Sequence, residues 1–133
     1  MVYLLDTHIL LWALQDSARL STKVRMILQD PQNGLRLSVI SLVEIAIKHQ
    51  KGKLSLAVSE ASLVNEAKKF GVRLLPLLPA HTTAFRDQAF EHPDPFDRLL
   101  LATAIGGPMY FLTADKKLHG LSELVVAVQP AAK

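Results

Sequence analysis

The sequence predicts an α/β fold, arranged as a three-layer α/β/α sandwich around a central, mostly parallel sheet. Short apolar runs bounded by turn residues recur along the chain, which is typical of buried strands. Between these runs, apolar residues follow helical spacing. Strands that alternate with helices form βαβ units, which build a parallel sheet covered by helices. The chain has 133 residues, enough for one domain, and we expect residues 1–133 to form it.

The first strand is predicted at residues 2–5. This run is continuously apolar, so we expect a central strand that is buried on both faces. A helix follows from Thr7 or His8, which places Asp6 where the strand ends and the helix begins. In open α/β sheets, ligands bind outside the carboxyl ends of the strands. Asp6 is therefore either a helix cap or a functional group.

The next elements are predicted from capping and breaking residues. Ser21 is expected to cap a helix that ends before Pro31, because the residue before a proline avoids the α region. A second strand is predicted at residues 35–39. Ser41 and Glu44 have the spacing of a capping box, so a helix is predicted to begin at Ser41.

The second half of the chain continues the alternation of strands and helices. Residues 54–58 are expected to be extended, and the prolines at 93 and 95 exclude a regular helix between residues 91 and 95. The remaining predicted elements are a helix from Ser59 or Ala57, a strand at 72–75, a helix from 79 to about 90, a helix at 96–105 and strands at 109–112 and 124–128.

The composition excludes several classes of protein. Half of the residues are hydrophobic and 20% are charged, which favours a packed core over disorder. The chain has no cysteine, which excludes a disulfide framework, a zinc ribbon and a cysteine nucleophile. We see no signal peptide and no run long enough to span a bilayer, so we expect a cytoplasmic protein with no membrane partner. The net charge of +3 is compatible with a nucleic-acid partner.

Four carboxylates are predicted to gather at one edge of the sheet. Asp6 follows the first strand, Glu44 lies early in the helix after the second strand, Asp97 lies in the first turn of a helix, and Asp115 follows the fourth strand. The carboxyl ends of parallel strands share one edge, so all four side chains can point into one crevice. Clustered carboxylates repel one another unless they share protons or bind a cation. In a chain without cysteine, such a cluster suits Mg²⁺ or Mn²⁺.

Each of these carboxylates also has a purely structural interpretation. Asp6 could cap the helix that follows it, and Glu44 could be a capping-box partner. Asp97 could interact with the helix dipole, and Asp115 could belong to a loop turn. Asp94 is expected to be the N-cap of the next helix. The combination favours a functional site, because independent caps need not fall at the same edge of a sheet.

Four segments, in this order and spacing, resemble a PIN-domain ribonuclease and particularly the VapC-type toxins of type II toxin–antitoxin systems. The resemblance extends from residue 3 to about residue 118. It implies a PIN-like fold and a Mg²⁺- or Mn²⁺-dependent endoribonuclease that hydrolyses RNA phosphodiester bonds. The segments are YLLDTHILLWAL, SLVEIAIKHQKGKL, HPDPFDRLLLATA and TADKKL.

The resemblance also implies roles for individual residues and for partners. The aspartate of the LLDTH motif matches Asp6, and the family's other acidic positions match Glu44, Asp97 and Asp115; these four would be catalytic and would hold the metal. Thr7 would orient a carboxylate or a water. The partners implied are an RNA substrate, a cognate antitoxin protein and a second copy of the chain in a homodimer.

Residues beside the acidic motifs are candidates for supporting the site and for contacting the substrate. We expect Asp94 to support the site, and Lys48, Lys51, Lys53 and Arg98 to be candidates for contacts with RNA phosphates. The lysines could instead form a solvated helix end, and Arg98 could pair with Asp94 or Glu44. His8 and His92 are expected to be structural or near the substrate rather than metal ligands. The only tryptophan, Trp12, is expected in the core or at a dimer interface.

Two other functions fit parts of the sequence. A phosphatase of the haloacid-dehalogenase kind also places an aspartate after the first strand, but it needs a second acid two residues later. His8 occupies that position. The other alternative is a catalytically silent PIN-like module that binds RNA or a protein.

Overall fold

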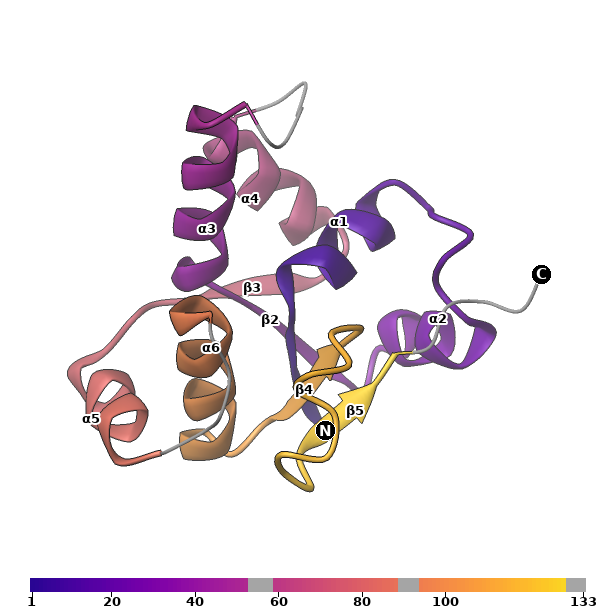
Figure 1. Ribbon diagram of the computed structural model, residues 1–133. Helices are drawn as coiled ribbons and strands as arrows, with labels where there is room; N and C mark the ends of the chain where they lie inside the picture. Colours follow the sequence, from indigo (N-terminus) through magenta and orange to yellow (C-terminus); the bar gives the residue numbers. More distant parts are fainter. Residues whose placement is uncertain (53–58, 89–93, 129–133) are drawn as a thin grey trace.

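A computed structural model describes residues 1–52, 59–88 and 94–128 (Figure 1). The described residues form a five-stranded sheet in the order β3-β2-β1-β4-β5, and every pair of neighbouring strands is parallel. The fold class predicted from the sequence is therefore confirmed. The strands are β1 (Val2–Leu5), β2 (Gly34–Ser38), β3 (Val72–Leu75), β4 (Tyr110–Thr113) and β5 (Val125–Ala127).

Helices cover both faces of the sheet, which gives the three layers. Alternate side chains of β1 point to opposite faces: Tyr3 and Leu5 join one core cluster, and Leu4 joins the other. The first cluster packs under α1, α2 and α4, and the second lies against α6, with α5 packed outside α6 (Figure 1). The helices are α1 (Thr7–Leu14), α2 (Thr22–Gln29), α3 (Val39–Gln50), α4 (Glu60–Lys69), α5 (Pro79–Asp87) and α6 (Pro95–Gly106).

The strand order reverses beside β1. The chain proceeds from β1 through β2 to β3 at one edge, and then returns so that β4 lies on the other side of β1. Such a reversal is the topological switch point at which open α/β sheets bind their ligands. The carboxyl ends of β1 and β4, next to Asp6 and Thr113, meet there.

The start of α3 differs from the prediction. The helix begins at Val39, and the hydroxyl of Ser38 caps it by accepting a hydrogen bond from the Ile40 amide at 3.0 Å. Ser41 lies inside the helix and is fully buried, so the predicted capping box of Ser41 and Glu44 is wrong. The strand ends one residue early because Ser38, the last residue of β2 paired with β3, supplies the cap itself.

Other boundaries shift by one or two residues, as expected for helix and strand ends. The caps predicted at Ser21 and Asp94 are confirmed. Of the two predicted starts for the helix at Ser59 or Ala57, Ser59 is the N-cap of α4. β4 begins at Tyr110 rather than residue 109, and α6 begins at Pro95. The helix predicted to reach about residue 90 ends earlier, at Asp87, where Gln88 takes an extended backbone and forms the C-cap. The extended segment predicted at 54–58 lies outside the described residues. Within the described ranges, no helix has the length and apolar character needed to cross a membrane.

Candidate active site

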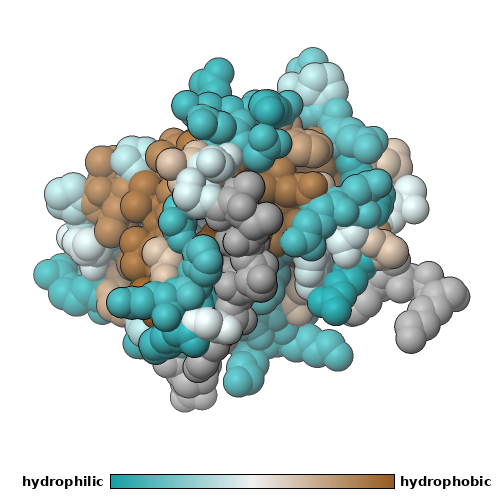
Figure 2. All heavy atoms as spheres, turned by 90° about the horizontal axis from the view of Figure 1, so that it is seen from above, coloured by the Kyte–Doolittle hydropathy of each residue, from teal (hydrophilic) through white to brown (hydrophobic). Residues whose placement is uncertain are grey.

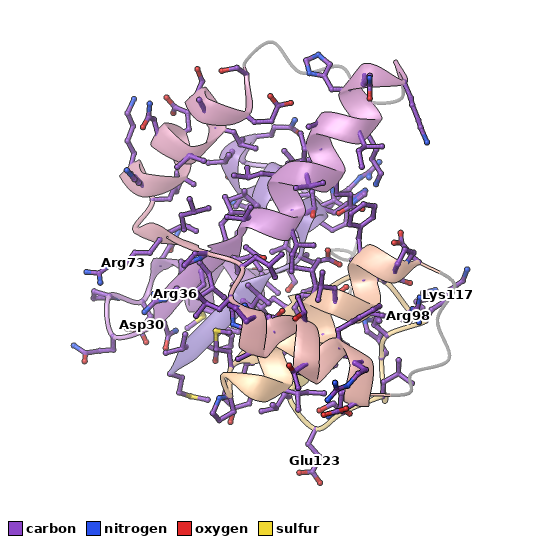
Figure 3. The ribbon with its side chains drawn as sticks, turned by 90° about the vertical axis from the view of Figure 1, so that its left-hand side faces the viewer. Asp30, Arg36, Arg73, Arg98, Lys117 and Glu123 are labelled. Carbon is purple, nitrogen blue, oxygen red and sulfur yellow. The ribbon has the colours of Figure 1, made fainter. Side chains whose placement is uncertain are left out.

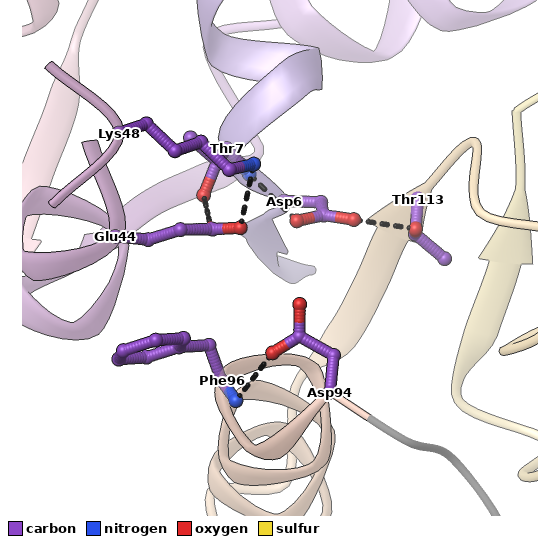
Figure 4. A network of polar contacts seen from close by, with 7 residues as sticks. All are labelled: Asp6, Thr7, Glu44, Lys48, Asp94, Phe96 and Thr113. Carbon is purple, nitrogen blue, oxygen red and sulfur yellow. Dashed lines mark hydrogen bonds and ion pairs between the residues drawn. The ribbon is translucent and has the colours of Figure 1, made fainter. Parts of the chain in front are cut away.

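Asp6 connects the ends of the two central strands. Its Oδ1 accepts a hydrogen bond from the Thr7 amide at 2.7 Å, which caps α1, and its Oδ2 accepts one from the Thr113 hydroxyl at 2.6 Å (Figure 4). Its side chain is buried, with 8% of the residue exposed. Asp6 therefore does cap the helix, and the same contacts fix its carboxylate at the switch point.

Glu44 brings α3 to the same place. It lies in the second turn of the helix and is only 6% exposed. Its Oε1 accepts from the Thr7 hydroxyl at 2.7 Å, and its Oε2 accepts from Lys48 Nζ at 3.1 Å (Figure 4). Thr7 thus uses its amide for Asp6 and its hydroxyl for Glu44, and it sets the relative position of the two carboxylates.

Asp94 and Asp97 approach from the start of α6. Asp94 caps this helix, because its Oδ1 accepts from the Phe96 amide at 2.8 Å. Its other oxygen points toward Glu44 and Asp6 (Figure 4). One carboxylate oxygen from each of Glu44, Asp94 and Asp97 lies within 4.8 Å of the other two. Asp94 was expected only to support the site, but its carboxylate lies together with those of Glu44 and Asp97.

Asp115 lies on the loop after β4. Its Oδ1 accepts from the Lys117 amide at 3.0 Å, and its own amide donates to the Thr113 hydroxyl at 3.0 Å. The loop-turn interpretation of Asp115 is therefore correct in its geometry. The sequence did not point to Thr113, a fully buried hydroxyl that links Asp6 to the Asp115 loop. A hydroxyl at the end of a buried strand, beside a strand that ends in aspartate, was the available signal.

These side chains line one hollow of about 390 Å³. A second hollow of about 290 Å³ shares Glu44, Lys48 and Asp94, and adds Lys51 to the lining. Lys48 and Lys51, two of the predicted phosphate contacts, therefore border the acidic site. The first hollow is lined by Asp6, His8, Trp12, Arg19, Glu44, Lys48, Asp94, Asp97, Ala114 and Asp115.

Arg98 has a different environment. Its guanidinium carbon lies 5.2 Å from the centre of the Phe85 ring, so the side chain packs between α6 and α5 (Figure 3). Its buried Nε has no hydrogen-bond partner among the described residues, and the described linings of the two hollows do not include Arg98. The other two residues noted near the site, Lys53 and His92, lie outside the described residues.

The site holds more negative charge than its surroundings neutralise. The pKa of Asp97 is raised to about 8, chiefly by burial and then by the charges of Asp6, Asp94, Glu44 and Asp115 in that order. Burial also raises the pKa of Asp6, against the hydrogen bonds from Thr113 and Thr7. A cluster of carboxylate oxygens in this state suits a hard divalent cation such as Mg²⁺ or Mn²⁺.

One wall of the hollow is not acidic. Trp12 is half-buried and packs against a core cluster, as the sequence predicted, but it also lines the hollow. The His8 ring meets it edge-on with 6.2 Å between ring centres, and the Arg19 guanidinium lies 5.5 Å from the centre of the indole. No pattern in the sequence connects Arg19 with the site.

The fold and the site define an α/β protein with a carboxylate-lined hollow at the switch point of a parallel sheet. Residues 3–124 match the family model of the PIN domain, and the chain belongs to this family. The family predicted from the sequence motifs is therefore confirmed.

Similar solved structures support the fold. VapBC2 from Rickettsia felis, bound to a DNA fragment from their promoter, includes a chain that is 17% identical with a TM-score of 0.68; the match covers 98% of this chain and 99% of that one. A toxin–antitoxin complex from Klebsiella pneumoniae includes a chain that is 19% identical with a TM-score of 0.63; the match covers 94% of this chain and 96% of that one. A search of curated proteins finds no match.

Proposed function

We propose that this PIN-domain protein is a Mg²⁺- or Mn²⁺-dependent endoribonuclease and the toxin of a toxin–antitoxin pair. The observation that carries the proposal is the convergence of Glu44, Asp94 and Asp97 within 4.8 Å, in a hollow that Asp6 and Asp115 also line. Membership of the PIN-domain family supports it.

The carboxylates fit a divalent metal by their donor type and by their charge. Glu44, Asp94 and Asp97 would hold the ion, with Asp6 and Asp115 adding negative charge around it. A bound Mg²⁺ or Mn²⁺ would lower the pKa of a water molecule and offset the negative charge that develops on the attacked phosphate. Asp97, whose pKa is raised by burial and by the neighbouring carboxylates, would release its proton when the cation binds, because a metal ligand must be deprotonated.

The remaining polar residues position these groups and the substrate. Thr7 and Thr113 hold Asp6 and Glu44 by their hydroxyls. Lys48 neutralises part of the charge of Glu44 while its side chain stays 37% exposed. Together with Lys51 on the neighbouring hollow, Lys48 is placed to meet the phosphates of an RNA strand.

The antitoxin is the proposed protein partner. Both similar structures come from complexes described as toxin–antitoxin or VapBC. This chain exposes large apolar side chains, including Val43, Phe70, Leu74, Leu77 and Leu78, which a partner protein or a second copy in a homodimer would cover. Apolar side chains also reach the surface between hydrophilic ones in the view from above (Figure 2). An RNA substrate and an antitoxin would both be met in the cytoplasm, where we place the protein.

The first experiment is cleavage of labelled single-stranded RNA with Mg²⁺ or Mn²⁺. We expect cleavage that EDTA abolishes. We also expect Asp6→Asn to lower the cleavage rate about a hundredfold or more, because mutating even a residue that only positions a metal ligand commonly lowers activity or metal affinity by about 10–100-fold. Asp30→Asn is the matched control, since Asp30 is an exposed aspartate that caps a turn by accepting from the Gln32 amide. Cleavage that persists in EDTA, or that Asp6→Asn leaves intact, would falsify the proposal.

The same assay tests the alternatives. A silent binding module would bind RNA without cleaving it under any metal. A haloacid-dehalogenase-type phosphatase has no support from the site, because the position two residues after Asp6 carries His8, whose ring packs against Trp12.

A further inference from the structure

Three residues line the hollow without any place in the metal chemistry. His8 and Trp12 lie four residues apart on α1 and so share one face of the helix, and Arg19 follows on the loop after it. None of them is a carboxylate, and the lysine contacts to the acidic group come from α3 instead. This aromatic and cationic wall is therefore a separate feature of the same hollow.

A flat cation lies over the Trp12 ring. The Arg19 guanidinium lies 5.5 Å from the ring centre, within the range of a cation–π contact. Arg19 is exposed while Trp12 is half-buried against the core. The arginine can therefore swing away at little cost, whereas the indole is fixed.

The backbone holds this wall in place. The Ser17 amide donates to the Trp12 carbonyl at 2.9 Å, which folds the loop back on the end of α1. Arg25 donates to the Ser17 carbonyl at 2.5 Å and also pairs with Asp16. Arg25 on α2 thus anchors the backbone of the loop that carries Arg19, while the Arg19 side chain itself stays exposed.

We propose that Trp12 and Arg19 form a nucleobase subsite, in which a base of single-stranded RNA stacks on the Trp12 ring beside the carboxylates. The proposal rests on the proposed function for the position of the phosphate. Bases in single strands stack on aromatic rings and on arginine planes, and each has the flat shape of the guanidinium that now covers the indole. The hollow of about 390 Å³ lies within the size range of small-molecule pockets.

Trp12 is the only tryptophan in the chain, so its fluorescence reports on the subsite directly. We would titrate the unmodified protein with a short oligoadenylate and, separately, with an abasic oligomer of the same length. Ca²⁺ would replace Mg²⁺ and Mn²⁺ in the buffer, so that binding is measured without cleavage. The subsite predicts that oligoadenylate quenches the fluorescence and that the abasic oligomer does not. Equal changes with both oligomers, or no change with either, would overturn it.

Variants test the same contact by a second measurement. Using fluorescence anisotropy of a labelled oligoadenylate, we expect Trp12→Ala to weaken binding on the order of tenfold and Trp12→Phe to recover most of it. Leu14→Ala is the matched control, because Leu14 packs against the same core cluster on α1 but does not line the hollow. If Trp12→Ala does not fold, Trp12→Phe and the quenching of the unmodified protein decide the result. An equal loss in Leu14→Ala, or unchanged affinity in a folded Trp12→Ala, would contradict the subsite.

The outcome separates this proposal from the nuclease proposal. Metal-dependent cleavage of RNA without base-dependent quenching would remove the subsite and keep the nuclease. Base-dependent quenching without cleavage under any metal would keep the subsite and remove the nuclease.

Discussion

Asp6 and Asp97 line the same hollow but are held by different means. Asp6 is fixed where β1 ends, and each of its oxygens accepts a short hydrogen bond from a threonine. Asp97 lies on the first turn of α6, and its pKa is raised by burial and by four neighbouring carboxylates. The strand side of the site, at Asp6, is therefore held by hydrogen bonds. On the helix side, at Asp97, neighbouring carboxylates repel one another, and a bound cation would relieve this repulsion.

The largest expected effect is the stabilisation of the helix side by metal. Mg²⁺ at a hundred times its dissociation constant is expected to raise the free energy of unfolding by about 2.7 kcal/mol, because the ion binds only the folded site. Asp97→Asn should lose most of this gain, and Asp30→Asn should keep it. Thermal unfolding with and without Mg²⁺ measures the effect. If Mg²⁺ raises the melting temperature of Asp97→Asn as much as that of the parent protein, Asp97 is not part of the metal site.

The strand side is tested by Thr113→Val. The change keeps the shape of the side chain but leaves the buried Oδ2 of Asp6 without its donor, so we expect a loss of about 2 kcal/mol in the free energy of unfolding. Thr103→Val is the matched control: Thr103 is also fully buried, but its hydroxyl donates only to the Leu99 carbonyl of its own helix. Urea unfolding of the two variants should separate them, and equal losses would show that Thr113 has no special role.

The charge on the helix side predicts a pH dependence without metal. The folded protein binds a proton at Asp97 up to a pKa of about 8, whereas the unfolded chain releases it near 3.8. Stability should therefore fall as pH rises between these values. Because Asp97 is only half-buried, solvent screening reduces the effect, and we expect Asp97→Asn to be more stable at pH 8 by about 1–2 kcal/mol. Unfolding curves at pH 5 and pH 8 in EDTA measure this difference in stability. If the stability of Asp97→Asn depends on pH as strongly as that of the parent protein, Asp97 is not the group responsible.

The smallest expected effect is that of Lys48 on stability. Its ion pair with Glu44 spans one helical turn, and Lys48 is partly exposed, so Lys48→Met should cost only about 0.5 kcal/mol. RNA affinity should fall more clearly and should lose part of its salt dependence, because a phosphate contact is removed. Filter binding at two salt concentrations measures the salt dependence of RNA affinity. If Lys48→Met leaves that dependence unchanged, Lys48 makes no phosphate contact and only pairs with Glu44.

The sequence predicted the strand side better than the helix side. Asp6 could be placed because a continuous apolar run, followed at once by polar residues, marks the end of a buried strand regardless of tertiary contacts. The four carboxylates proposed from the sequence do line one hollow, since parallel strands end at a common edge. Ser38 and Ser41 illustrate the limit: both satisfy the local rule for a cap, and only the pairing of β2 with β3 decides between them.

Most of the contacts that sequence reasoning missed join distant segments. Asp94 was correctly predicted as a cap, but its second oxygen meets Glu44 only because α3 and α6 pack together. The hydrogen bond from the Thr113 hydroxyl to Asp6 is of the same kind. The cation–π contact of Arg19 with Trp12 joins α1 to the loop after it, and it leaves no trace in periodicity or composition. Such contacts depend on how elements are brought together, which local patterns do not encode.

The hydrogen bond between Asp6 and Thr113 joins residues 107 positions apart. During synthesis, the segment with Asp6 is therefore made well before the segment with Thr113. Contacts of such long sequence separation form late in folding, because the entropy of closing the intervening loop must be overcome first. The candidate active site is therefore incomplete in any nascent or truncated chain that lacks β4. For the ribonuclease proposed above, this topology would postpone RNA cleavage until β4 has been synthesised.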